Sequence, residues 1–266
     1  MPQASALTIA GSDSGGGAGI QADLKAFSAL GVYGTSAITA ITAQNTRGVF
    51  AVETVSPSMV AAQIAAVLDD IPPGAIKIGM LASAEIVEVV AAGLSGFAGP
   101  VVLDPVMVAK SGDALLDPDA VTALTRKLLP RADVLTPNLP EAARLLGCAQ
   151  ARTTGDAAAQ GRALMKLGAR AVVMKGGHAE GPRCIDLLVT AGGEVALEQP
   201  RIETRNTHGT GCSLSSAIAA ELAKGADLEA AVRRAQAWLH GAIRAADGLG
   251  IGGGHGPVHH FHEVWT

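Results

Sequence analysis

The chain has 266 residues, of which 48% are hydrophobic and 17% charged, and its formal net charge is −4. That length is enough to bury a sizeable core, while the slight acidity and the lack of basic runs argue against a nucleic-acid partner. There is no run of about 18 apolar residues for a membrane span and no signal-peptide pattern, and three widely spaced cysteines suit a reducing compartment, so we expect a cytoplasmic protein.

In chain order, short apolar runs alternate with alanine-rich stretches of helical period. The runs are nearly continuous in apolar character, which is typical of a parallel sheet covered on both faces. They are residues 7–11, 37–42, 75–80, 101–107, 133–138 and 171–177. Between them, Ser56 and Asp117, each followed by proline, mark helix starts. The alternation predicts an α/β protein, a three-layer α/β/α sandwich with a mostly parallel, doubly wound sheet.

Two stretches depart from this alternation. Residues 184–202 resemble a hairpin that turns at Gly192–Gly193, which we place at the far edge of the sheet. Residues 248–257 are too rich in glycine for a helix and predict a loop. We find no linker and no repeat, so we expect one domain over residues 1–266, with little or no separate lid.

Polar and glycine residues gather where the predicted strands end. In open α/β sheets, ligands bind outside the carboxyl ends of the strands, so these residues predict an active site on one edge. They are the segment 11–19, Gln44 and Asn45, Met80, Asp104, Asn138, and Lys175 with the glycines that follow it.

The segment GSDSGGGAG (11–19) has more than one reading. A P-loop needs lysine where Gly17 stands, so that pattern fails. Gly17–Ala22 fits the dinucleotide pattern G-x-G-x-x-A, but Gln44 and Asn45 occupy the place where the ribose-binding acid belongs. A purely structural glycine turn and a close approach of the backbone to a small ligand, with Asp23 one helical turn on, both remain open.

The stretch NTHGTGC (206–212) precedes a predicted helix and carries the stronger signal. Gly209 and Gly211 allow consecutive backbone N–H groups to converge at a helix N-terminus, as an anion hole for a transferring phosphoryl group requires. At this place the helix field should lower the pKa of Cys212. Two alternatives are a small buried cysteine behind a glycine turn and a thiol hydrolase that uses His208 as its base.

Other candidates have an ordinary reading beside the functional one. Lys175 could contact a phosphate or be a solvated lysine at a strand end, and Asp104 could bind magnesium or be part of a turn. Asn138 and Glu141 could contact hydrated Mg²⁺, or Asn138 could simply cap the helix that holds Glu141. The histidines near the C-terminus fit no standard metal spacing, and we interpret them as a surface tail; they are His259, His260 and His262.

Taken together, the motifs resemble those of the hydroxymethylpyrimidine/phosphomethylpyrimidine kinases of thiamine biosynthesis, in the ribokinase-like superfamily. The resemblance runs from about residue 6 to residue 262, with the motifs in the same order. They are GSDSGGGAGIQADLK, TAQNT, KIGML, DPVMVAKSGDALL, ADVLTPNLPEA, KGGH, HGTGC and GHGPVHHF.

The resemblance implies a kinase that uses ATP and Mg²⁺. Such enzymes phosphorylate 4-amino-5-hydroxymethyl-2-methylpyrimidine and then its monophosphate, which gives the pyrophosphate. By position, the residues that surround the pyrimidine are Gln44, which hydrogen-bonds it, and Gly11, Asp23, Met80 and Val106. The anion hole is Gly209, Thr210 and Gly211; Lys175 contacts phosphate; and the magnesium and water network is Asp104, Asn138 and Glu141.

Cys212 falls at the position of the catalytic base, where sugar kinases of the superfamily have an aspartate. Because a free thiol has a pKa of about 8.5, its role as a base depends on its surroundings more than a carboxylate's would. The physical chemistry of the acceptor site agrees with the resemblance. The Gln44 amide can donate and accept, as an aminopyrimidine edge requires, and Met80 and Val106 could provide apolar walls.

Two rival functions stay open at this stage. A pyridoxal or pyridoxine kinase on the same scaffold would also act on a methylated six-membered heterocycle that carries a hydroxymethyl group. A non-catalytic pyrimidine-binding protein would keep the fold without the full set of catalytic residues. Relatives close their sites with a small β lid or by pairing subunits, and we therefore expect a homodimer here.

Overall fold

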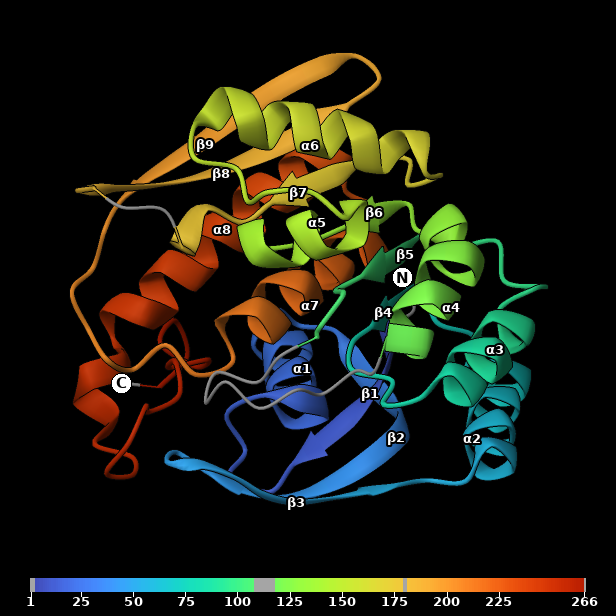
Figure 1. Cartoon of the computed structure of the whole chain (residues 1–266). Helices are drawn as coiled ribbons and strands as arrows, with labels where there is room; N and C mark the ends of the chain where they lie inside the picture. Colours follow the sequence, from blue (N-terminus) through green and yellow to red (C-terminus); the bar gives the residue numbers. More distant parts are fainter. Residues whose placement is uncertain (1–2, 108–117, 179–180, 266) are drawn as a thin grey trace.

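The structure, a computed structural model, describes residues 3–107, 118–178 and 181–265. Its centre is one nine-stranded sheet with the order β3-β2-β1-β4-β5-β6-β7-β8-β9 (Figure 1). The strands from β2 to β7 along this order pair in parallel, whereas β3, β8 and β9 are antiparallel to their neighbours. The strands are β1 (Ser5–Asp13), β2 (Tyr33–Asn45), β3 (Gly48–Thr54), β4 (Ala75–Ile78), β5 (Val101–Leu103), β6 (Val134–Leu135), β7 (Val172–Met174), β8 (Arg183–Thr190) and β9 (Gly193–Pro200).

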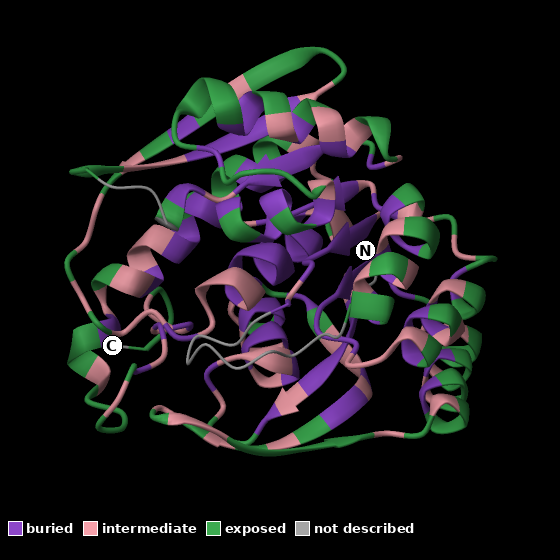
Figure 2. Ribbon diagram, viewed as in Figure 1, coloured by how far each residue is buried: buried purple, intermediate pink, exposed green. Residues whose placement is uncertain are grey.

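Helices cover both faces of this sheet. One layer packs its own apolar cluster against the sheet and consists of α1 (Gly19–Ala29), α7 (Thr210–Ala223) and α8 (Leu228–Arg244). The opposite layer consists of α2 (Pro57–Asp70), α3 (Ala84–Gly93), α4 (Pro118–Lys127), α5 (Leu139–Leu146) and α6 (Thr154–Lys166). Burial follows these layers, with the central strands and the inward helix faces buried (Figure 2). The expected three-layer, doubly wound α/β/α fold is therefore confirmed.

Local sequence signals explain where several helices begin. Ser56 caps α2 by accepting the backbone N–H of Met59, and Pro57 occupies the first helical position, as expected. Asn138 caps α5 in the same way and forms a capping box with Glu141. These caps matter for the site because α5 and α7 both begin at the carboxyl edge of the sheet.

The apolar runs locate the strands but overestimate several of them. The runs 101–107, 133–138 and 171–177 contain strands of only two or three residues, because their polar ends leave the sheet and turn over the site. Conversely, β2 extends through Gln44 and Asn45, and the exposed edge strand β3 has no counterpart in the prediction. The hairpin of β8 and β9 lies at the far edge, as predicted, and continues the main sheet. That residues 1–266 form a single domain stays a prediction.

Candidate active site

A cavity of about 680 Å³ opens at the carboxyl edge of the parallel strands. Of the residues that the sequence places in the site, Asp23 alone does not line this cavity. Those that line it are Gly11, Gln44, Met80, Val106, Asp104, Asn138, Glu141, Lys175, Gly209, Thr210, Gly211 and Cys212. Residues up to 200 positions apart in the chain are thus brought to one surface, as the rule for open α/β sheets predicts.

The N-terminus of α7 forms the floor of the cavity. Gly209, the N-cap residue, has φ +78°, and a Cβ atom there would lie 1.8 Å from the carbonyl oxygen of Gly17. Only glycine fits this position, both for its backbone conformation and for its contact with the glycine-rich segment. The first N–H groups of a helix have no partner within it, so α7 presents donors and the positive end of its dipole to the cavity.

The Cys212 thiol is buried in the first turn of α7, and its titration differs from our expectation. Burial raises the pKa of Cys212 to about 11, and the carboxylates of Asp23 and Asp104 add to this effect. The Lys77 charge and the N–H of Gly19 oppose the rise without cancelling it. The prediction that the helix N-terminus lowers this pKa is therefore wrong, because desolvation of a thiolate outweighs the helix field.

A charged cluster lies beside Cys212 on the strands β5 and β7. Lys175 Nζ is 2.7 Å from Asp104 Oδ1 and 3.7 Å from Glu141 Oε2. Burial would raise the pKa of Asp104, but Lys175 and Lys77 outweigh it and hold this pKa below its usual value. In return, despite the opposing effect of burial, Asp104 and Glu141 raise the pKa of Lys175. The cluster therefore keeps a permanent ammonium group at the helix mouth.

Glu141 and Asn138 connect this cluster to the start of α5. Asn138 Oδ1 accepts the N–H of Glu141 at 2.8 Å, and Glu141 Oε2 accepts the N–H of Asn138 at 2.7 Å. Burial raises the pKa of Glu141, against the charge of Lys175. Among the residues that the structure describes, no group of three or more His, Cys, Asp or Glu side chains has the arrangement of a metal site. Asp104 and Glu141 remain as two carboxylates at the cavity surface.

Lys77 is the site residue that sequence reasoning missed. It is a lysine within the otherwise apolar strand β4, fully buried, and its Nζ lies 2.8 and 2.9 Å from the two carboxylate oxygens of Asp23. Asp23 also accepts hydrogen bonds from Thr8 and Ser216, so its oxygens are occupied. The predicted contact of Asp23 with the substrate needs correction: Asp23 holds Lys77, and it is Lys77 that lines the cavity.

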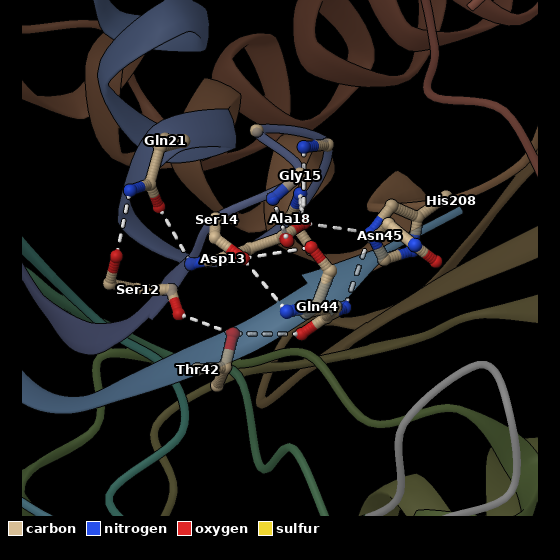
Figure 3. Close-up of polar contacts among 12 residues, drawn as sticks. Ser12, Asp13, Ser14, Gly15, Ala18, Gln21, Thr42, Gln44, Asn45 and His208 are labelled. Atoms are coloured by element: carbon tan, nitrogen blue, oxygen red, sulfur yellow. Dashed lines mark hydrogen bonds and ion pairs between the residues drawn. The ribbon is translucent and has the colours of Figure 1, made fainter. Parts of the chain in front are cut away.

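At the opposite end of the cavity, Gln44 meets the glycine-rich segment. The Asp13 carboxylate accepts the backbone N–H groups of Gly15, Gly17 and Ala18 and lies 2.8 Å from His208 Nε2 (Figure 3). The segment 11–19 is thus wrapped around a carboxylate of its own. At its beginning, a Cβ atom on Gly11 would come within 2.8 Å of Met80, so the backbone closely approaches the cavity wall there.

The histidines near the C-terminus differ from the predicted surface tail. His260 is buried, its Nε2 lies 2.9 Å from the hydroxyl of Ser213, and burial lowers its pKa to about 3. His260 therefore supports the first turn of α7 as a neutral side chain. His259 and His262 pack against Trp265 and Trp238, respectively.

Comparison with known proteins agrees with this geometry. A sequence profile described as phosphomethylpyrimidine kinase matches residues 13–259. The chain belongs to this family. It is 60% identical to the hydroxymethylpyrimidine/phosphomethylpyrimidine kinase of Rhizobium meliloti, over 98% of each chain.

Two solved structures show how widely the family's fold extends. The phosphomethylpyrimidine kinase of Clostridium difficile 630 is 45% identical, with a TM-score of 0.81, and the match covers 91% of this chain and all of that one. The pyridoxal kinase of Staphylococcus aureus in complex with ADP is 33% identical, with a TM-score of 0.91 over 99% of this chain and 96% of that one. Family membership thus rests on sequence identity, while the fold alone also accommodates pyridoxal kinases.

Membership in a kinase family settles the alternatives that the glycine-rich segment left open. The G-x-G-x-x-A pattern of Gly17–Ala22 overlaps the bend into α1, where Gly17 and Ala18 donate to Asp13. The segment therefore serves as a turn closed by a carboxylate. Among the described residues, no helix is long and apolar enough to cross a bilayer.

Proposed function

We propose that this chain phosphorylates 4-amino-5-hydroxymethyl-2-methylpyrimidine and then its monophosphate, as the family name indicates, in thiamine biosynthesis. The observation that carries the proposal is one cavity with two unlike ends. Gln44, whose amide can match an aminopyrimidine edge, lines one end, and the Gly209–Cys212 helix mouth with Lys175 lines the other. The acceptor hydroxyl would lie between them, facing the donor.

ATP, the phosphoryl donor that a kinase family implies, fits the second end. Lys175 would contact the transferring phosphate as a point charge, and the N–H groups of Gly209, Thr210 and Gly211 would surround its oxygens. Mg²⁺ in such enzymes is bound by one or two carboxylates together with phosphates and water, so the pair of Asp104 and Glu141 fits it. Asn138 would contribute through Glu141, because its side-chain oxygen already caps α5.

Transfer itself requires little covalent chemistry from the protein. The acceptor oxygen attacks the γ-phosphorus while the bond to the β-phosphate bridge breaks, and the hydroxyl proton leaves as the new bond forms. Cys212 is placed to orient this hydroxyl and to take its proton late in the transfer. A pKa of about 11 in the free enzyme means that the thiol starts protonated at neutral pH. Positioning and the Lys175 charge must therefore supply most of the rate enhancement.

A coupled ADP-release assay tests the proposal directly. The enzyme would be supplied with ATP, Mg²⁺ and, side by side, hydroxymethylpyrimidine, its monophosphate and pyridoxine. We expect the two pyrimidines to be consumed with the higher kcat/KM. Preference for pyridoxine would favour a pyridoxal-kinase function, which at present only the shared fold supports. No ADP release with any of the three would favour a non-catalytic pyrimidine-binding protein.

We also propose a homodimer and a cytoplasmic location. Apolar side chains on the β2–β3 edge support the dimer: Ile41, Phe50 and Val52 are 49%, 69% and 48% exposed. They lie on strands next to Gln44, so a partner chain seated there would also shield the acceptor end of the cavity. Light scattering should give twice the chain mass for the wild type and a lower mass for Phe50→Asp. Free thiols at Cys148, Cys184 and Cys212 suit a reducing compartment.

A further inference from the structure

The side-chain amide of Gln44 lies between two polar neighbours that together decide which way it faces. Its Nε2 is 3.4 Å from His208 Nε2, and its Oε1 is 3.3 Å from Thr42 Oγ1 (Figure 3). The oxygen and nitrogen of a side-chain amide occupy nearly the same space, so their order follows from the donors and acceptors around them. Both neighbours can be assigned from their other contacts.

Asp13 determines which ring nitrogen of His208 carries a proton. Asp13 Oδ2 lies 2.8 Å from His208 Nε2, and the same carboxylate accepts three backbone N–H groups. Burial alone would raise the pKa of Asp13, but the hydrogen bond from His208 and those from the backbone hold it below its usual value. An ionised carboxylate accepts only, so His208 Nε2 must be a donor. A donor at this nitrogen cannot accept from an amide NH₂ group.

Thr42 is constrained from the other side. Its hydroxyl donates to the carbonyl oxygen of Ser12 at 2.9 Å. A hydroxyl has one hydrogen, so toward Gln44 Thr42 can only accept. The group of Gln44 that faces Thr42 must therefore be the NH₂ group, and both neighbours require the same orientation.

We infer that His208, held by Asp13, and Thr42 together lock the Gln44 amide with its oxygen toward His208 and its nitrogen toward Thr42, and thereby determine which heterocycle edge the enzyme accepts. In this orientation the His208 Nε2–H is shared between Asp13 and Gln44 Oε1, and Gln44 Nε2 donates to Thr42. Every polar group of the network is then satisfied. The acceptor meets an amide whose order of donor and acceptor is fixed in advance.

The consequence for specificity rests on the proposed function. A 4-aminopyrimidine presents an amino donor beside a ring-nitrogen acceptor, and the locked amide accepts the amino group on the His208 side and donates to the ring nitrogen on the Thr42 side. The 4-oxo analogue has the reverse order, with a carbonyl acceptor beside a ring N–H. Binding it would require the amide to turn and two hydrogen bonds of the network to break. His208 is thus a positioning residue that sets specificity through Gln44.

The test compares kcat/KM for hydroxymethylpyrimidine with kcat/KM for its 4-oxo analogue. In the wild type the ratio should be at least about 100, because a site built around fixed hydrogen bonds rejects the mismatched analogue strongly. In His208→Leu the amide is free to turn, and the ratio should fall by about tenfold or more. His208→Gln should restore most of the ratio, since its amide nitrogen can donate to both Asp13 and Gln44.

Gln21→Leu is the matched control. Gln21 bonds to Ser12 and to the N–H of Asp13 in the same segment but does not bond to Gln44 (Figure 3). It should change kcat/KM for both acceptors by the same factor and leave the ratio intact. A ratio that stays at the wild-type value in His208→Leu would overturn the inference while leaving the proposed function in place. A wild type that does not use hydroxymethylpyrimidine would instead overturn the proposed function.

A second measurement requires no variant. Long-range ¹H–¹⁵N correlation spectra of the wild-type protein should show His208 with a proton on Nε2 across neutral pH. An unprotonated Nε2 would contradict the lock even if His208→Leu failed to fold.

Discussion

The two ends of the cavity differ in how they are built. At the acceptor end, Gln44 is held by hydrogen bonds around one carboxylate, Asp13, whose partners are mostly backbone N–H groups. At the phosphate end, two ion pairs meet, Asp23 with Lys77 and Asp104 with Lys175. The first arrangement fixes the directions of a few donors and acceptors, whereas the second concentrates charge. This difference indicates that recognition and rate enhancement are separate tasks of separate residues, which substitutions can verify.

The largest effect should come from breaking the buried ion pair beneath the phosphate end. Lys77→Met leaves the Asp23 carboxylate buried without a counter-charge, and we expect it to lower the free energy of unfolding by about 3–5 kcal/mol. Urea denaturation followed by circular dichroism measures this. Lys77→Met combined with Asp23→Asn should recover most of the loss. A single variant within about 1 kcal/mol of the wild type would show that the pair contributes little.

Lys175→Met removes the ammonium group that faces the transferring phosphate. Because this charge acts mainly on the transition state, kcat should fall by about 10²–10³-fold, with little change in KM for the pyrimidine. Steady-state kinetics with ATP saturating gives both constants. A rise in the acceptor KM with kcat preserved would mean that the two ends do not divide the work as described.

Cys212→Ala tests the residue between the two ends. We expect kcat to fall by about 10²-fold while the chain still folds, because the hydroxyl loses the group that orients it and takes its proton. Thermal unfolding of the variant serves as the folding control. Near-normal turnover would remove Cys212 from the mechanism. In the free wild type, alkylation of this thiol should be slow at pH 7 and accelerate toward a pKa of about 11.

The smallest effect concerns the support of α7, on which both ends depend. Because burial lowers the pKa of His260 from 6.5 to about 3, the unfolded chain binds a proton between these pH values that the folded chain does not. The free energy of unfolding should therefore fall on acidification below pH 6.5, by about 1.4 kcal/mol per pH unit from this group. His260→Gln can keep the bond to Ser213 without titrating, so its profile should be flatter. Identical profiles would contradict this assignment.

The sequence predicted the sheet and the site edge because both depend on local signals. Fully covered strands such as β4 are continuous apolar runs, and Ser56 and Pro57 mark the start of α2 in the sequence itself. The strand β3 was missed because its side chains are mostly exposed, so no apolar pattern distinguishes it. Elements that bury a face are predictable in this fold, and exposed edges are not.

The titration of Cys212 and the role of Asp23 could not be read from the sequence. Both depend on burial and on partners distant in the chain, and the position of Cys212 at a helix start suggested the opposite pKa shift. Lys77 left one signal that sequence reasoning did not use, namely a lysine inside an apolar strand next to a glycine. Such a lysine must be paired when buried, so it indicates a hidden carboxylate.

Isothermal titration of hydroxymethylpyrimidine without nucleotide tests the division of the cavity most directly. Three proteins would be compared: the wild type, Gln44→Ala and Lys175→Met. We predict that Gln44→Ala weakens the Kd by about tenfold or more, since two hydrogen bonds to the heterocycle are lost, while Lys175→Met leaves it unchanged within error. An unchanged Kd in Gln44→Ala, or an equal loss in Lys175→Met, would contradict the account.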